Sequence, residues 1–280
     1  MIPPTVAREI QASGSHGIRS ILTGIAGGAF SGLTGVGGGA VMVPLLTGQL
    51  KLSQHRAHGT SLAIIMFVAV SGVVGYWQAG NIDWRLVLAL VPGAVAGVYA
   101  GARAMVKVPA LQLRLLFGAF LFLVAFRQLV WHYSAGAPQG GVEGLLIEGV
   151  FGFAGGVLAG VLGVGGGAIF VPAIVIFGLA RVGPGEDPQK IAQGVSLVVI
   201  IATGAVGTVT NLRQETIDVE TVRWVMPAAV VAAFVASLFA NRLDVEVLKA
   251  IYGITALFLG CQIIYTTTRA LRGRATEQRV

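Results

Sequence analysis

The stretch Gly35-Val36-Gly37-Gly38-Gly39-Ala40 occurs twice in this chain, because it returns 128 positions later as Gly163-Val164-Gly165-Gly166-Gly167-Ala168. A Val-Pro pair follows each copy, and the same shift gives 12 identities over the 19 positions from 26 to 44. Both copies lie inside runs without a charged residue, at 20–50 and 149–180. The chain therefore contains an internal repeat, and its most similar part is a glycine-rich stretch inside an apolar segment.

The lengths of the two uncharged runs do not fit simple membrane spans. The runs hold 31 and 32 residues, which is roughly 46 Å as helix, whereas a hydrocarbon core is about 30 Å thick. Each run is too long for one straight membrane span and too short for two full spans joined by a loop. We therefore predict a broken or re-entrant pair of short helices meeting at the glycines in each repeat. The free N–H groups at each break are expected to form a nest that faces an anion.

Composition assigns the chain to the membrane class. Of its 280 residues, 55% are apolar and 11% are charged, which excludes a soluble globule. The net charge of +7 is spread over short loops and a tail, so it indicates orientation in the bilayer rather than nucleic-acid binding. Cys261 is expected to be a packing residue, and the 4 histidines lack metal-ligand spacing. We expect no metal, no cofactor and no enzyme activity.

The repeat continues past the glycines with an offset of 135, which matches Ser61 to Ser196. Each half therefore holds one broken helix pair and three further spans, and this odd number of crossings inverts the second half. The predicted fold is an all-α polytopic membrane protein with two inverted-topology repeats, each a broken or re-entrant helix pair plus three transmembrane helices. The predicted divisions are an N-terminal tail at 1–17, repeat 1 at 18–133, a linker at 134–142, repeat 2 at 143–268 and a basic cytoplasmic tail at 269–280.

Rows of small residues predict where helices touch. Small side chains let membrane helices approach closely. In the first half such residues recur at every fourth position of the predicted span 86–102, as Gly93, Gly97 and Gly101. The second half has a similar row, formed by Ala228, Ala232 and Ala236. Each row is expected to pack against another helix.

Polar side chains recur beside both breaks. Thr60 and Ser61 stand near the start of the span after the first break, and Gln193 and Ser196 take the same places in the second half, where Gln193 aligns with His58. Hydroxyl and amide groups near helix starts can hold an oxyanion loosely enough to release it. The predicted substrate-binding residues are Gly37, Gly38, Gly39, Gly165, Gly166, Gly167, His58, Thr60, Ser61, Gln193 and Ser196.

Other interpretations of these residues stay open. The glycines could serve only close helix packing, and each Ser could satisfy local backbone. The glycines also fit the dinucleotide pattern G-x-G-x-x-A, which needs a preceding strand and an acidic residue about 20 positions on. The first copy meets no carboxylate before Asp83, which argues against nucleotide binding.

Charged residues are rare within the predicted spans. Arg127 is the deepest, and Trp131 one turn later favours an Arg side chain that reaches back to the headgroups. No acidic residue is expected deep in a span to carry a coupling proton.

The two GVGGGAxxVP copies, the span starts Gly-Thr-Ser-Leu at 59–62 and Gly-Val-Ser-Leu at 194–197, and Asn-Ile-Asp-Trp at 81–84 resemble the sulfite exporter TauE/SafE family, also called TSUP. The resemblance covers about residues 18–268. It implies a secondary transporter of the cell inner (plasma) membrane that exports small sulfur-containing anions, such as sulfite or organosulfonates, from a site at mid-membrane between the repeats. Two features differ between the halves. The loop at 181–190 is longer than its counterpart, and His58 aligns with Gln193. These differences predict an asymmetric pocket.

Two further functions stay open beside the exporter. One is a passive anion channel or a permease subunit that requires a partner, and the other is a membrane scaffold. The expected partners are a small sulfur oxyanion or sulfonate and the lipid bilayer, with no nucleic acid. A coupling proton and a homo-oligomer are not decided by the sequence.

Lysine and arginine counts predict the orientation. With a cytoplasmic N-terminus, 13 of these residues lie in inside segments and 6 in outside segments, so both termini should be cytoplasmic. In a Cys261→Ser background, Ser134→Cys should react with an impermeant thiol reagent added outside the cell, and Lys107→Cys should not. The reverse labelling pattern would contradict the inverted-repeat arrangement.

Overall fold

The structure is a computed structural model that describes residues 4–104, 142–162, 165–177 and 186–277, together with 115, 118–119, 122, 125–126, 179–180 and 182. Every regular element in these ranges is an α-helix, as predicted. The elements are α1 (Pro4–Thr34), α2 (Gly39–Gly48), α3 (Gln54–Gln78), α4 (Trp84–Ala104), α6 (Val142–Leu162), α7 (Gly167–Ile176), α8 (Pro188–Arg213), α9 (Val219–Arg242) and α10 (Val245–Glu277). Arg127 and most of the third predicted span lie outside the described residues.

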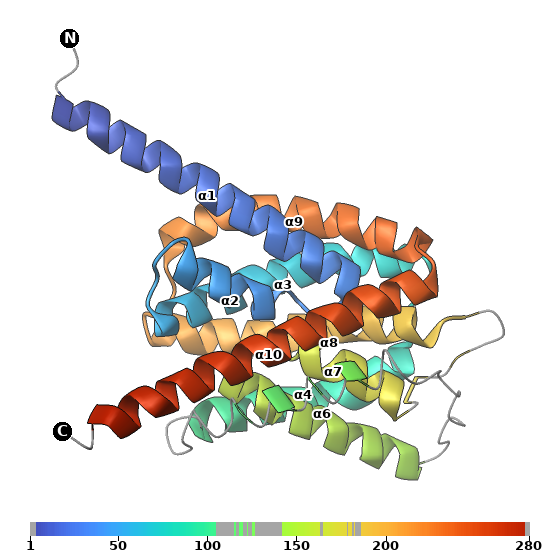
Figure 1. Cartoon of the computed structure of the whole chain (residues 1–280). Coiled ribbons are helices and arrows are strands. Elements are labelled where there is room, and N and C mark those ends of the chain that lie inside the picture. Colours follow the sequence, from blue (N-terminus) through green and yellow to red (C-terminus); the bar gives the residue numbers. More distant parts are fainter. Residues whose placement is uncertain are drawn as a thin grey trace.

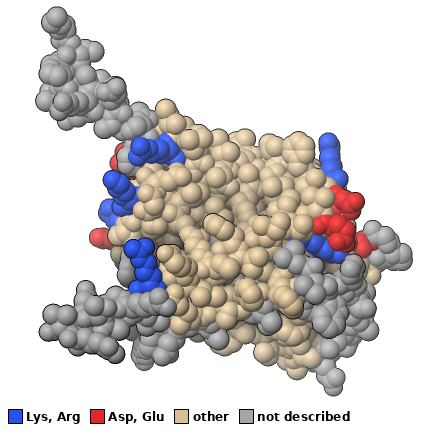
Figure 2. Space-filling view, viewed as in Figure 1, with Lys and Arg blue, Asp and Glu red and all other residues tan. Residues whose placement is uncertain are grey.

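The described helices form a bundle with an apolar middle. Five of them, namely α3, α4, α8, α9 and α10, contain stretches long and apolar enough to cross a bilayer. Figure 2 shows the charged side chains gathered at two opposite ends of the molecule, with a wide uncharged band between them. Such a band matches the need to keep charges out of hydrocarbon. The chain is a multi-pass membrane protein.

The two ends of the chain extend further as helix than the sequence indicates. Residues 4–17, predicted as a tail, begin a continuous α1, and α10 continues to Glu277 through most of the predicted basic tail. Pro4 stands at the first position of α1, where its missing N–H is not needed. Each further residue adds a backbone hydrogen bond once a helix has formed. α1 begins and α10 ends at the same end of the bundle, at the left of Figure 1.

The helix breaks at both glycine-rich stretches, as predicted. α1 ends at Thr34 and α2 begins at Gly39, whereas α6 ends at Leu162 and α7 begins at Gly167. α2 and α7 have 10 residues each, about 15 Å or half of a hydrocarbon core. Each break therefore joins a long helix to a half helix.

α2 folds back along α1 instead of continuing its direction. A Cβ on Gly38 would lie 3.3 Å from the Ser31 Cβ, and the Thr23 hydroxyl donates to Gln49 Oε1 over 3.2 Å. Residues further along α2 thus meet residues earlier in α1. α7 turns back along α6 in the same way, because Gly166 lies beside Ala159 and Phe170 beside Gly155. Each glycine-rich loop is therefore the tip of a re-entrant hairpin.

Glycines on α1 and α6 bring backbones into direct contact with helices of the other half. A Cβ on Gly24 would overlap the Val225 carbonyl oxygen of α9, and a Cβ on Gly152 would overlap the Leu90 carbonyl oxygen of α4. With the sequence offsets of 128 and 135, these two contacts are equivalent. Gly28 with Ala229 and Gly156 with Ala94 form a second equivalent pair. Each half is thus clamped to the other by the same kind of contact.

The predicted small-residue row on α4 is confirmed, and the row on α9 is confirmed in part. Gly93, Gly97 and Gly101 all face α6 at distances that leave no room for a Cβ. On α9, the Cβ of Ala228 lies 3.1 Å from a Cβ placed on Gly24, and that of Ala236 lies 2.9 Å from one placed on Gly32, so both contact α1 as expected. Ala232 is only partly buried, and the buried residues Val225, Ala229 and Ala233 also meet the glycine row of α1, which the sequence did not single out.

Contacts between α3 and α8 define the directions of the helices. Gly72 lies beside Leu197, and Gly207 beside Leu62, so α3 and α8 are antiparallel. The contacts above make α1 parallel to α9 and α4 parallel to α6, and Gly75 beside Ser237 makes α3 parallel to α9. α1, α3 and α9 therefore run one way, and α4, α6 and α8 run the other way (Figure 1).

Substitutions at the interhelical glycines should destabilise the protein. Gly28→Ala and Gly156→Ala would place a methyl group against a backbone carbonyl, so each should cost about 1–3 kcal/mol. Gly48→Ala is the matched control, because nothing lies within 4 Å of its added Cβ. The measurement is thermal unfolding in detergent. Equal unfolding temperatures for all three variants would contradict the glycine-mediated contact.

Candidate functional site

The two glycine-rich loops share one backbone conformation. Gly37 and Gly165 both have φ 79°, and Gly38 and Gly166 have φ 71° and 84°. Positive φ is unfavourable for residues with a Cβ by roughly 1–2 kcal/mol. Gly38 and Gly166 are the N-cap residues of α2 and α7, without a side-chain cap. The glycines therefore set the path by which the chain enters each half helix.

The two loops touch at the point where α3 and α8 cross. Ile65 and Ile200, which are repeat counterparts, both lie within 4 Å of a Cβ placed on Gly37 or on Gly165. A Cβ on Gly167 would overlap the carbonyl of Val36. The N-terminal ends of α2 and α7 thus approach one another inside the bundle, from opposite directions.

Glycine N–H groups at both loops have no acceptor among the described residues. No acceptor is recorded among the described residues for the N–H groups of the six central glycines, Gly37, Gly38, Gly39, Gly165, Gly166 and Gly167. All six glycines are buried. The next donors pair normally, since Met42 N–H donates to Gly38 O and Phe170 N–H to Gly166 O. Buried amides almost always find a protein, water or ligand partner, and a helix N-terminus carries roughly half a positive charge. The arrangement can hold an anion.

The predicted serines occupy matched places beside these loops. The Ser196 hydroxyl donates to Gly35 O over 3.0 Å, which connects α8 to the first loop. Ser61, its counterpart on α3, is fully buried, and its Oγ has no hydrogen-bond partner in the described part of the chain. Ser61 stands one turn before Ile65, which contacts both loops. Of the two matched serines, Ser61 is therefore the one whose hydroxyl can still donate a hydrogen bond to a ligand.

Gln193 lies against the first loop. Its Cβ would be 2.6 Å from a Cβ on Gly35, and its Oε1 accepts a hydrogen bond from the Tyr76 hydroxyl over 2.9 Å. The same hydroxyl is 3.1 Å from Gly32 O. Gln193 Nε2 has no partner among the described residues. Tyr76 was not singled out from the sequence, because its repeat counterpart is Asn211 and no shared pattern marks it.

The remaining predicted residues lie towards the start of α3. The Thr60 hydroxyl oxygen accepts a hydrogen bond from Asp218 N–H over 2.9 Å, which fastens α3 to the turn before α9. His58 is partly buried. A role for either residue in substrate binding stays a prediction.

Among the described residues, no group of three or more His, Cys, Asp or Glu side chains is placed to hold a metal ion. Cys261, predicted to pack inside, is exposed on α10.

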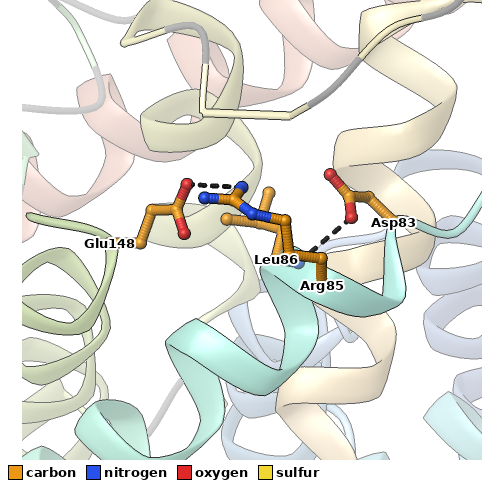
Figure 3. Close-up of polar contacts among 4 residues, drawn as sticks. All are labelled: Asp83, Arg85, Leu86 and Glu148. Carbon is orange, nitrogen blue, oxygen red and sulfur yellow. Dashed lines mark hydrogen bonds and ion pairs between the residues drawn. The ribbon is translucent and has the colours of Figure 1, made fainter. Parts of the chain in front are cut away.

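A buried ion pair lies at the start of α4, and the sequence did not reveal it. The Arg85 guanidinium at the start of α4 contacts Glu148 Oε1 on α6 at 2.8 Å, and the Glu148 side chain is only 3% exposed (Figure 3). Asp83 Oδ1 accepts from Leu86 N–H and caps α4 beside this pair. Glu148 directly precedes the uncharged run that begins at 149. Its burial depends on contact between α4 and α6, which sequence periodicity does not reveal.

The fold and the site define the class of protein to which the chain belongs. The chain is a polytopic helical membrane protein in which the glycine-rich tips of two helix hairpins touch, and the glycine amides at these tips have no acceptor among the described residues. The family model for "Sulfite exporter TauE/SafE" matches residues 4–128 and 149–280. The chain therefore belongs to this family.

Curated relatives of the chain are membrane transporters by name. It is similar to the probable membrane transporter protein YdhB of Bacillus subtilis, with 26% identity over 228 residues that cover 80% of this chain and 90% of the relative. YunE of the same organism is 24% identical over 231 residues, 75% of this chain and 80% of the relative. A probable membrane transporter protein of Xylella fastidiosa is 22% identical over 275 residues, 95% and 99% of the two chains. No solved structure gives a significant match.

Breaking the buried ion pair should be costly. Glu148→Gln removes the carboxylate that pairs with Arg85 and should lower stability by on the order of 3 kcal/mol. Lys249→Met, which breaks an ion pair with the exposed Glu246, should cost at most about 1 kcal/mol. The combined variant Arg85→Met, Glu148→Met should recover part of the loss, because no buried charge is left unpaired. Thermal unfolding in detergent measures all three, and a Glu148→Gln shift no larger than that of Lys249→Met would refute this account of the pair.

Proposed function

We propose that the protein is a secondary transporter, operating as an exporter, of small sulfur-containing anions such as sulfite or organosulfonates. Membership in the family and the names of the relatives make it a membrane transporter. The sulfur oxyanion or sulfonate is our proposal, and it draws on the family description. The anion is bound at mid-membrane, between the two halves, where the glycine-rich loops meet.

The observation that carries this proposal is the group of buried N–H donors at the two loops that have no acceptor among the described residues. They belong to the starts of α2 and α7, so both helix dipoles present their positive ends to one region. Neutral donors neutralise an oxyanion only in part, which keeps binding weak enough for release. A fixed basic side chain is therefore not needed for recognition.

The two halves supply a route for movement of the anion across the membrane. We interpret them as inverted-topology repeats at 18–133 and 143–268, joined by the linker at 134–142. The opposite directions of α3 and α8, and the equivalent contacts of α1 with α9 and α6 with α4, support this interpretation. Rocking of one half against the other around a fixed central site would expose the anion to each side in turn.

The orientation proposal follows the charges. Lys and Arg predominate at the end of the molecule where α1 begins and α10 ends, at the left of Figure 2. We propose that this end is cytoplasmic and that the protein resides in the cell inner membrane. Export would then carry the anion from this end to the opposite one.

Transport by the purified protein in liposomes tests the function. The panel is sulfite, thiosulfate, sulfoacetate, taurine and sulfate, with protein-free liposomes as the control. We expect protein-dependent movement of at least one sulfur anion that can be driven uphill by an imposed ion gradient. Strictly downhill movement under every gradient would favour the passive channel, and no movement of any anion would refute the proposal.

Ser61 offers the cleanest substitution at the proposed site. Its hydroxyl has no partner among the described residues, so Ser61→Ala should leave unfolding temperature unchanged while weakening anion binding by about fivefold, or 1 kcal/mol. Thr266→Ala is the control, because that exposed hydroxyl bonds only within α10. Titration calorimetry in nanodiscs measures binding. Unchanged affinity in Ser61→Ala would remove Ser61 from the site.

A further inference from the structure

The two re-entrant loops differ in one side chain that lies beside the start of each half helix. A Cβ on Gly38 would be 3.3 Å from the Ser31 Cβ, and a Cβ on Gly166 would be 3.1 Å from the Ala159 Cβ. Ser31 and Ala159 are repeat counterparts at the offset of 128. The same place in the fold therefore carries a hydroxyl at the first break and a methyl group at the second.

The Ser31 hydroxyl is a buried polar group beside the first break. Ser31 is 0% exposed, and its Oγ has no hydrogen-bond partner in the part of the chain that the structure describes. Thr34, one turn later on α1, behaves in the usual way and donates to Phe30 O over 2.7 Å. A hydroxyl buried in an apolar bundle is unfavourable unless something bonds to it. Ser31 thus has an unused donor next to the first residues of α2.

Aromatic and amide groups increase the contrast between the loops. At the second loop, a Cβ on Gly166 would be 2.6 Å from Phe170 Cε2, so an apolar ring lies against the start of α7. The counterpart of Phe170 is Met42, which lies beside Gly27, as Phe170 lies beside Gly155, but no Met42 atom is among the three atoms nearest to a Cβ on Gly38. At the first loop, the buried amide of Gln193 lies against Gly35. The second loop also has a polar neighbour, Thr203, but its hydroxyl already bonds to Gly165 O over 3.3 Å and within α8. At the first loop, Ser31 Oγ and Gln193 Nε2 have no partner among the described residues.

We propose that the protein binds one anion per chain, at the N-terminus of α2, and that Ser31 is a direct ligand of that anion. The inference rests on the proposed function, since it assumes that the glycine-rich loops form an anion site. The ligand is a small oxyanion, held by the N–H groups of Gly38 and Gly39 together with the Ser31 hydroxyl. The start of α7 packs against the first loop and does not bind a second anion.

A reciprocal exchange of one oxygen atom tests this assignment. Ser31→Ala gives the first break the side chain of the second, and Ala159→Ser does the reverse, so the two variants are matched in size and surroundings. Binding of sulfite and of sulfoacetate to the full chain in nanodiscs is measured by titration calorimetry. Thermal unfolding without added anion is measured in parallel.

We expect a stoichiometry of one, at least fivefold weaker binding in Ser31→Ala, and unchanged binding in Ala159→Ser. Unfolding temperature without anion should not fall in Ser31→Ala, because no hydrogen bond of Ser31 is lost. Ser31→Thr, which keeps a hydroxyl, should retain more affinity than Ser31→Ala.

Three results would overturn the assignment. These are wild-type affinity in Ser31→Ala, a stoichiometry of two, or a loss of affinity in Ser31→Ala that comes with an equal loss of stability. In each case the wild-type protein binds anions, so the proposed function stands while the role of Ser31 fails. If the wild-type protein binds neither anion, the proposed function fails first.

Discussion

An unpaired backbone amide costs several kcal/mol in hydrocarbon, and this constraint explains most of the architecture. The chain interrupts a helix twice inside its apolar band, so each interruption must be covered by protein. The glycines of α1 and α6 provide the cover, because they bring α9 and α4 to backbone contact and close the bundle around the loops. α3 and α8 then cross over the junction, with Ile65 and Ile200 against both loops. The glycine amides that have no acceptor among the described residues lie at the two loops, which touch each other.

The repeat allowed much of this frame to be predicted from sequence. Identical loop residues predicted identical loop conformations, and Gly37 and Gly165 indeed share φ 79°. The glycine row on α4 was recognisable because its spacing alone defines a face. The contact face of α9 was predicted only in part: Ala228 and Ala236 lie against α1, but the position of the glycine row on α1 determines that Ala229 and Ala233 are buried as well. Glu148 was missed for a similar reason, since its burial comes from packing on α4 rather than from its position in a run.

The candidate site was predictable only as far as the two halves agree. A comparison of the two repeats draws attention to matched pairs such as Ser61 and Ser196. It gives no weight to a position where the residues differ, such as Ser31, which aligns with Ala159. Yet matched residues build the frame, as Ser196 does by bonding to Gly35 O. A site that must bind and release one anion can depend on the residues that differ. In our proposal, similar backbone hairpins in the two halves carry different side chains at the site, and the chain therefore binds one anion.

The central claim is that the glycine-rich loops bind an oxyanion, and selenite allows it to be observed directly. Anomalous diffraction from crystals of the full chain soaked in selenite locates selenium without relying on any substitution. The account predicts a selenium peak within about 4 Å of the backbone nitrogens of Gly38 and Gly39, between the starts of α2 and α7, that is lost when excess sulfite is added. A selenium peak displaced by sulfite but remote from both loops would contradict it.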